Sequence, residues 1–163
     1  MAVHLIRHAD AGHRGSWDGP DGERPLNARG GAQAVALVVE LSLAAPRRIL
    51  SSPLVRCVET VQPLADALGL VVEPHPALAE GARREDTWAL LEALSGDEDA
   101  VLCSHGDVIP PLLDRLQRRG IPVQDAGRHV AKGSVWTVEA GPGGHLTAAR
   151  LAFAPWSVGS EGP

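Results

Sequence analysis

Short apolar runs alternate along the chain with longer stretches in which apolar residues recur every three to four positions. The runs predict buried strands at residues 3–6, 48–50, 70–73 and 100–103. The periodic stretches predict helices over residues 27–43, 52–68, 87–94 and 107–116. Because strands and helices alternate, we expect an α/β fold: a three-layer sandwich with a mostly parallel sheet covered by helices on both faces.

Several residues indicate where the predicted helices begin or bend. Asn27 is expected to cap the first helix and Asp107 the last, because both side chains accept hydrogen bonds from free backbone N–H groups. Ser52 is expected to cap the second helix, with Pro53 in its first turn. Pro63 lies inside that helix and should kink or split it, because proline has no N–H to donate.

The last part of the chain predicts a hairpin, with strands over residues 133–139 and 146–152 joined by the turn at 141–144. Two polar segments, 11–25 and 74–86, predict long loops, and loops of this length are often functional. The length of 163 residues fits one domain. We expect this domain to cover residues 1–155 and residues 156–163 to form a loose tail.

Charge and cysteine content limit the possible functions. A net charge of −5 argues against a nucleic-acid-binding surface. Cys57 and Cys103 fall in a predicted helix and a predicted buried strand, which is typical of a reduced, cytoplasmic protein. The first apolar run is too short for a signal peptide, and no segment is long enough to span a membrane. We therefore expect a cytoplasmic protein with neither a nucleic acid nor a membrane as partner.

Histidines and arginines follow three of the predicted strands. Arg7 and His8 end the first strand, Arg56 lies just after the second, and His105 follows the fourth. Ligand sites of open α/β sheets form at the carboxyl ends of the strands, so these four side chains are expected to meet. Phosphoryl transfer requires an in-line nucleophile and groups that stabilise the equatorial oxygens, and this set supplies both.

Each of these residue types has a defined use in that chemistry. A neutral His8, with one ring nitrogen held by a backbone acceptor, offers the other nitrogen as a nucleophile. Arg7 and Arg56 are able to bind phosphate oxygens in a bidentate manner. His105 comes just before a predicted helix, whose N-terminus favours an anion.

The same residues resemble the motifs of a known family. Residues 7–8 (RH), 52–56 (SPLVR) and 104–106 (SHG) resemble those of the histidine phosphatase superfamily, also called phosphoglycerate mutase-like. Residues 24–30 (RPLNARG) are similar to small bacterial phosphohistidine phosphatases. Residues 132–136 (KGSVW) are similar to histidine phosphatase domains that follow a Nudix domain, an analogy that implies nucleotide-related substrates.

The resemblance runs from residue 3 to about residue 152 and assigns roles. It implies that His8 becomes phosphorylated and that Arg7, Arg56 and His105 form the phosphate pocket. It further implies that Glu80, in the loop after the third strand, is the proton donor. Such a donor is needed for a poor leaving group such as an alkoxide and less for a phosphohistidine or acyl phosphate. The sequence departs from the family at position 9, which is alanine in place of the usual glycine.

Other residues have two interpretations each. Asp10 and Asp18 are alternative acids or cap and solvate the polar loop. Arg24 is a phosphate ligand or a structural residue. Trp17 and Trp88 line a substrate mouth or pack in the core. Lys132 and Ser134 are candidates for the rim of the pocket.

Four functions remain open from these observations. The first is a metal-independent phosphatase without a cofactor, acting on a phosphorylated small molecule, a nucleotide or a phosphohistidine protein. A mutase is disfavoured because only 23 residues separate Arg56 from Glu80 and 24 separate Glu80 from His105. A non-catalytic module that binds a phosphate or a nucleotide would not need His8. A metallohydrolase lacks the paired ligand spacing of metal sites.

Overall fold

A single six-stranded sheet forms the centre of the protein. The computed structural model describes residues 1–125 and 129–155, and its strand order is β3-β2-β4-β1-β5-β6. The strands are β1 (Ala2–Arg7), β2 (Arg48–Ser51), β3 (Val72–Pro74), β4 (Ala100–Ser104), β5 (Val135–Ala140) and β6 (Leu146–Phe153). The β1–β4, β4–β2 and β2–β3 pairs are parallel, and β5 is antiparallel to both of its neighbours. The expected mostly parallel sheet is confirmed.

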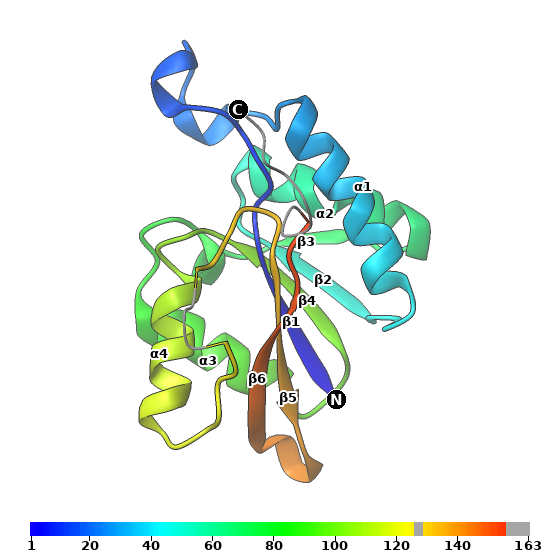
Figure 1. Ribbon diagram of the computed structural model, residues 1–163, viewed down its shortest axis with the longest axis vertical. Coiled ribbons are helices and arrows are strands. Elements are labelled where there is room, and N and C mark those ends of the chain that lie inside the picture. Colours follow the sequence, from blue (N-terminus) through cyan, green and yellow to red (C-terminus); the bar gives the residue numbers. More distant parts are fainter. Residues whose placement is uncertain (126–128, 156–163) are drawn as a thin grey trace.

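Helices cover both faces of this sheet (Figure 1). They are α1 (Ala28–Ser42), α2 (Val55–Leu68), α3 (Arg84–Leu94) and α4 (Ile109–Arg118). Alternate residues of β1 enter separate cores: Leu5 packs in the cluster that contains α3 and α4, and Ile6 in the cluster that contains α1 and α2. In β4, Leu102 packs in the cluster with α3 and α4, and Val101 packs in the cluster with α1 and α2. The predicted three-layer sandwich is therefore confirmed.

The ends of the helices differ from the expectations in three places. Helix α2 begins at Val55 rather than at Ser52, and it continues through Pro63 without being split. Helix α3 begins at Arg84, three residues earlier than predicted. Helix α4 begins at Ile109, and Asp107 does not cap it, because its carboxylate accepts a hydrogen bond from the Gly81 N–H at 2.8 Å.

The start of α1 agrees with the sequence. Asn27 Oδ1 accepts a hydrogen bond from the Gly30 N–H at 2.8 Å, as expected of a capping residue. Gly30 itself permits a close approach: a Cβ at this position would lie 2.0 Å from the carbonyl oxygen of Asp10. The first turn of α1 is thus packed directly against the segment that follows β1.

Strand register brings the candidate residues to one edge of the sheet. Arg7 is paired with Ser104, and Ser51 with Cys103, so the carboxyl ends of β1, β4 and β2 lie side by side. The His8 N–H donates to the Ser104 carbonyl at 2.9 Å, which extends the pairing beyond β1. No helix among residues 1–125 and 129–155 is both long and apolar enough to cross a membrane. Residues 156–163, the predicted tail, lie outside the described residues.

Candidate active site

His8 and His105 meet at the junctions that follow β1 and β4. Their ring centroids are 5.3 Å apart in a T-shaped arrangement, with an angle of 64° between the ring planes. His8 Nδ1 lies 2.7 Å from the carbonyl oxygen of Ala9. Because a carbonyl only accepts, Nδ1 carries the proton, and Nε2 is the nitrogen left with a lone pair.

The surroundings of His8 keep its ring uncharged. Burial lowers the pKa of His8 to about 3. The hydrogen bond to the Ala9 carbonyl opposes this shift, and the nearby His105, Arg56 and Arg7 add to it. With only 7% of its surface exposed, His8 is a neutral imidazole throughout the physiological pH range.

His105 contacts one side chain just before α2 and one in the first turn of α2. Its Nε2 lies 2.8 Å from Ser52 Oγ and 3.4 Å from Cys57 Sγ. Both partners are fully buried. Ser52 therefore positions His105 instead of capping α2, and this contact explains why a serine precedes the helix.

The guanidinium of Arg7 fits into a space that Gly106 leaves open. A Cβ on Gly106 would lie 2.8 Å from Cζ of Arg7, so the glycine of the Ser-His-Gly motif is required for this approach. Arg7 Nη1 donates to the Val130 carbonyl at 2.8 Å. Its Nε is buried and has no hydrogen-bond acceptor among the described residues. Burial lowers the pKa of Arg7, but a guanidinium stays charged at neutral pH.

Arg56 is 1% exposed and is held by two carboxylates. Its Nη2 lies 3.0 Å from Glu80 Oε2 and 3.2 Å from Asp21 Oδ2, and its Nη1 donates to the Asp21 carbonyl at 3.0 Å. Like Arg7, it has a buried Nε without an acceptor among the described residues. Two carboxylates and one carbonyl therefore satisfy the terminal nitrogens of this guanidinium.

Glu80 also contacts a second arginine. Its Oε1 accepts a hydrogen bond from Arg14 Nη2 at 2.8 Å. That hydrogen bond, together with the charges of Arg14 and Arg56, lowers the pKa of Glu80 even though partial burial opposes the shift. Glu80 is consequently ionised while it is bound to the two arginines.

These residues enclose a cavity of about 420 Å³. Within the described part of the chain, five basic residues line it against two acidic ones. Arg24, which is 6% exposed, donates from Nη1 to the carbonyls of Ala11 and Gly12 and so fixes the loop after His8. A protein with a net charge of −5 therefore contains a concentrated positive site. The lining comprises Arg7, His8, Gly12, Arg14, Arg24, Arg56, Glu80, His105, Gly106, Asp107 and Lys132.

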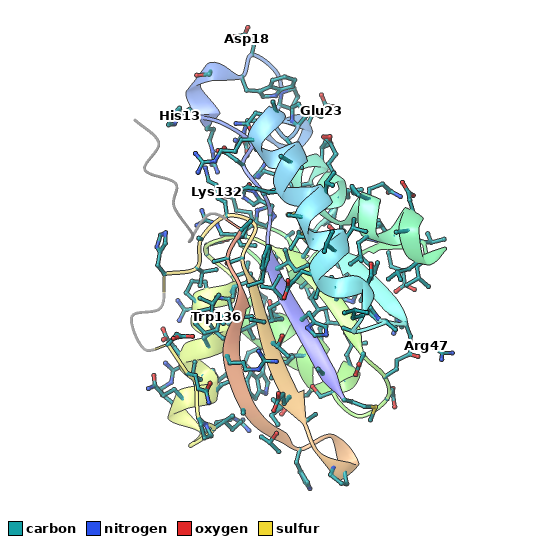
Figure 2. The ribbon with its side chains drawn as sticks, turned by 45° about the vertical axis from the view of Figure 1, so that its right-hand side comes forward. His13, Asp18, Glu23, Arg47, Lys132 and Trp136 are labelled. Carbon is teal, nitrogen blue, oxygen red and sulfur yellow. The ribbon has the colours of Figure 1, made fainter. Side chains whose placement is uncertain are left out.

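All five candidate site residues line this cavity: Arg7, His8, Arg56, Glu80 and His105. The other candidates separate into two groups. Lys132 lines the cavity and lies 3.8 Å from Asp10 Oδ1, below the loop that carries His13 and Asp18 in Figure 2. Arg24 also lines the cavity, whereas the remaining candidates are not in its lining: Asp10, Trp17, Asp18, Trp88 and Ser134. Trp88 is 3% exposed and packs in the core, and the Ser134 hydroxyl donates to the Ala131 carbonyl. No cluster suited to a metal ion occurs among residues 1–125 and 129–155.

Sequence comparisons relate the chain to known proteins. The model of the histidine phosphatase superfamily (branch 1) matches residues 3–82. An 8-oxo-(d)GTP phosphatase of Mycolicibacterium smegmatis is 35% identical over 146 residues, which cover 86% of this chain and 45% of that protein. Residues 3–82 are thus similar to the histidine phosphatase superfamily. It spans about half the length of the curated relative that it matches.

Solved structures of phosphatases share the fold of this protein. The protein histidine phosphatase SixA in complex with tungstate matches it with a TM-score of 0.71 at 21% identity, over 93% of this chain and 97% of the other. The mycobacterial glucosyl-3-phosphoglycerate phosphatase matches with a TM-score of 0.69 at 19% identity, over 94% and 98% of the two chains. Both likenesses establish the phosphoglycerate mutase-like fold.

The sequence analysis did not identify two residues at this site. Arg14 and Asp21 lie in the polar loop over residues 11–25, where no periodic pattern separates a solvated charge from one that turns inward. Their ion pairs with Glu80 and Arg56 depend on how this loop folds over the edge of the sheet. The only signal available was the unusual length of the loop.

Proposed function

We propose that the protein is a phosphatase that hydrolyses a phosphomonoester or a phosphohistidine through a covalent phosphohistidine on His8. One observation carries this proposal: His8 is buried and neutral, with Nδ1 donating to the Ala9 carbonyl, and it lies in a cavity lined by cationic side chains. A nucleophile of this kind needs no general base, because its lone pair is available without loss of a proton.

The reaction proceeds in two steps. His8 Nε2 attacks phosphorus, the bond to the leaving oxygen or nitrogen breaks, and the leaving group takes a proton from Glu80. Water then attacks the phosphohistidine, gives a proton to Glu80, and releases phosphate and the free imidazole. Arg7, Arg56 and His105 stabilise the charge on the equatorial oxygens in both steps, which is the role that metal ions have in other phosphoryl-transfer enzymes.

Two features of the arginines support binding of a phosphoryl dianion. Arg7 and Arg56 each have a buried Nε–H without an acceptor in the described structure, and a buried donor without a partner costs free energy that an anionic ligand recovers. Arg56 is bound to Glu80 and Asp21, so substrate phosphate oxygens would replace these carboxylate oxygens.

This replacement also prepares Glu80 to act as an acid. In the free protein, Arg14 and Arg56 keep the carboxylate ionised. A bound phosphoryl dianion would bind Arg56 in place of Glu80 and would add a negative charge near the Glu80 carboxylate. Loss of the arginine contact and the added negative charge both raise the pKa of a carboxyl group. Glu80 thus gains its proton when the substrate arrives.

We further propose a nucleotide or another phosphorylated small molecule as substrate, with a phosphohistidine protein as the second possibility. The relative with 35% identity is an 8-oxo-(d)GTP phosphatase. A second cavity of about 250 Å³ shares Gly12 and Arg24 with the phosphate site and is lined by His13 and Trp17. The half-exposed indole of Trp17 offers a flat apolar wall on which a base can stack.

The test is a comparison of wild type and His8→Asn on a panel of nucleoside phosphates, sugar phosphates and phosphohistidine peptides, with and without a chelator. Asparagine retains a donor near the Nδ1 position but has no nucleophilic nitrogen. We expect turnover by the wild type that a chelator does not change, and no turnover by His8→Asn. A chelator-sensitive activity that persists in His8→Asn would contradict the proposal.

A further inference from the structure

A second basic groove lies between α3 and α4, on the face of the sheet opposite α1 and α2. Its volume is about 400 Å³, and it has no lining residue in common with the cavity around His8. Val108, Pro111 and Leu112 give it an apolar floor. Arginines form its rim: Arg84 at the start of α3, and Arg115, Arg118 and Arg119 at the end of α4.

The charge of this groove is unbalanced. Glu85 is the one acidic residue in its described lining, and it is already paired with Arg115 at 2.8 Å. Among residues 1–125 and 129–155, no ion pair involves Arg84 or Arg118, and both side chains are exposed. Two guanidinium groups without an ion pair among the described residues therefore line the same groove, in a protein whose net charge is −5.

Helix stability does not account for all of these arginines. Basic residues in the last turn of α4 interact favourably with the negative end of its dipole. Arg84, however, is the first residue of α3, where the dipole favours an acidic residue. Its position works against α3 and completes the positive rim of the groove.

The arginines on α4 are held in place before any ligand binds. The Cζ atoms of Arg115 and Arg119 lie 4.5 and 4.9 Å from the centroid of the Trp88 ring, in the geometry of cation–π contacts. Trp88 is 3% exposed and fixed in the core. Side chains that are already ordered lose less conformational entropy when they bind a ligand.

We propose that this groove binds a small organic oligophosphate, of the chemical class that a nucleoside diphosphate represents. The planar guanidinium of arginine binds phosphate oxygens in a bidentate manner, and the apolar floor suits the uncharged body of such a ligand. The volume falls within the range of small-molecule sites. This site is separate from the phosphatase centre and does not depend on chemistry at His8.

Calorimetric titration with ADP tests the proposal, in a background in which Arg7→Gln and Arg56→Gln disable the phosphate pocket. We expect one remaining ADP site, and we expect Arg84→Gln with Arg118→Gln to weaken it by at least about tenfold, since charge-assisted hydrogen bonds are lost. Arg47→Gln with Arg150→Gln removes the same charge from exposed pairs elsewhere and should leave the affinity unchanged.

Two results would overturn the proposal: no ADP binding in the background variant, or equal weakening by both pairs of substitutions. If the background variant does not fold, hydrogen exchange of the wild type with ADP decides the question. We expect protection of residues 84–88 and 108–119 in addition to the phosphatase site. Protection confined to the residues around His8 would refute a second site.

Discussion

Replacing His8 with asparagine should make the stability of the protein less sensitive to acid. The native imidazole is neutral, because burial lowers its pKa to about 3. In the unfolded chain the same group has a pKa of about 6.5. As the pH falls below that unfolded value, the unfolded state binds a proton that the native state does not, so the free energy of unfolding decreases.

The size of the effect follows from the two pKa values. Each pKa unit corresponds to about 1.4 kcal/mol, and about 1.5 units separate pH 5 from the unfolded pKa of histidine. Lowering the pH from about 7.5 to about 5 should therefore cost about 2 kcal/mol of stability through His8 alone. The loss is complete only near the native pKa of about 3.

Urea unfolding of wild type and His8→Asn at both pH values measures this difference. We expect the stability of His8→Asn to fall by about 2 kcal/mol less than that of the wild type between about pH 7.5 and about pH 5. His13→Asn, which removes an exposed histidine from the polar loop, controls for the loss of an imidazole. Equal acid sensitivity in the wild type and His8→Asn would refute the assignment of a neutral, buried His8.

Two further substitutions test the acid and the packing beside the site. Glu80→Gln should lower kcat for an alkyl phosphate by about a hundredfold and should change the hydrolysis of a phosphoramidate far less, because nitrogen is the better leaving group. Glu92→Gln, at an exposed position, is the control. Equal effects of Glu80→Gln on both substrates would exclude Glu80 as the proton donor. Gly30→Ala should destabilise the protein by up to about 3 kcal/mol because its Cβ meets the Asp10 carbonyl. Gly31→Ala is the control: its Cβ would meet no atom, so it should stabilise α1 by about 0.5 to 1 kcal/mol. Thermal unfolding measures both variants, and equal changes in stability for Gly30→Ala and Gly31→Ala would refute the close contact between Gly30 and Asp10.

The sequence is most informative where the chain is buried. Apolar runs identify the strands, and the three junctions that follow β1, β2 and β4 identify His8, Arg56 and His105, because parallel strands place their carboxyl ends at one edge. The hairpin of β5 and β6 follows from alternation and a glycine-rich turn.

Prediction fails where a polar side chain has both a local and a distant partner. Serine and aspartate are residue types that often cap helices, but neither Ser52 nor Asp107 does so here. Ser52 instead contacts His105, and Asp107 accepts a hydrogen bond from the Gly81 N–H. The start of α3 at Arg84 is likewise not visible in the sequence, because a basic residue there opposes the helix dipole.

The sequence also does not predict the ion pairs of Arg56. Asp21 and Glu80 are separated from Arg56 by 34 and 23 residues. Asp21 begins a short 3-10 helix within the polar segment 11–25, and Glu80 lies in a turn. The contact depends on loop conformation, which neither periodicity nor composition specifies.

Detection of a phosphorylated enzyme tests the central claim most directly. Wild type and His8→Asn would be mixed with a radiolabelled phosphomonoester, quenched within milliseconds in base, and analysed by peptide mapping. We predict an acid-labile, base-stable label on the peptide that contains His8 in the wild type, and no label in His8→Asn. Turnover by the wild type without any label, or the same label on His8→Asn, would contradict the covalent mechanism.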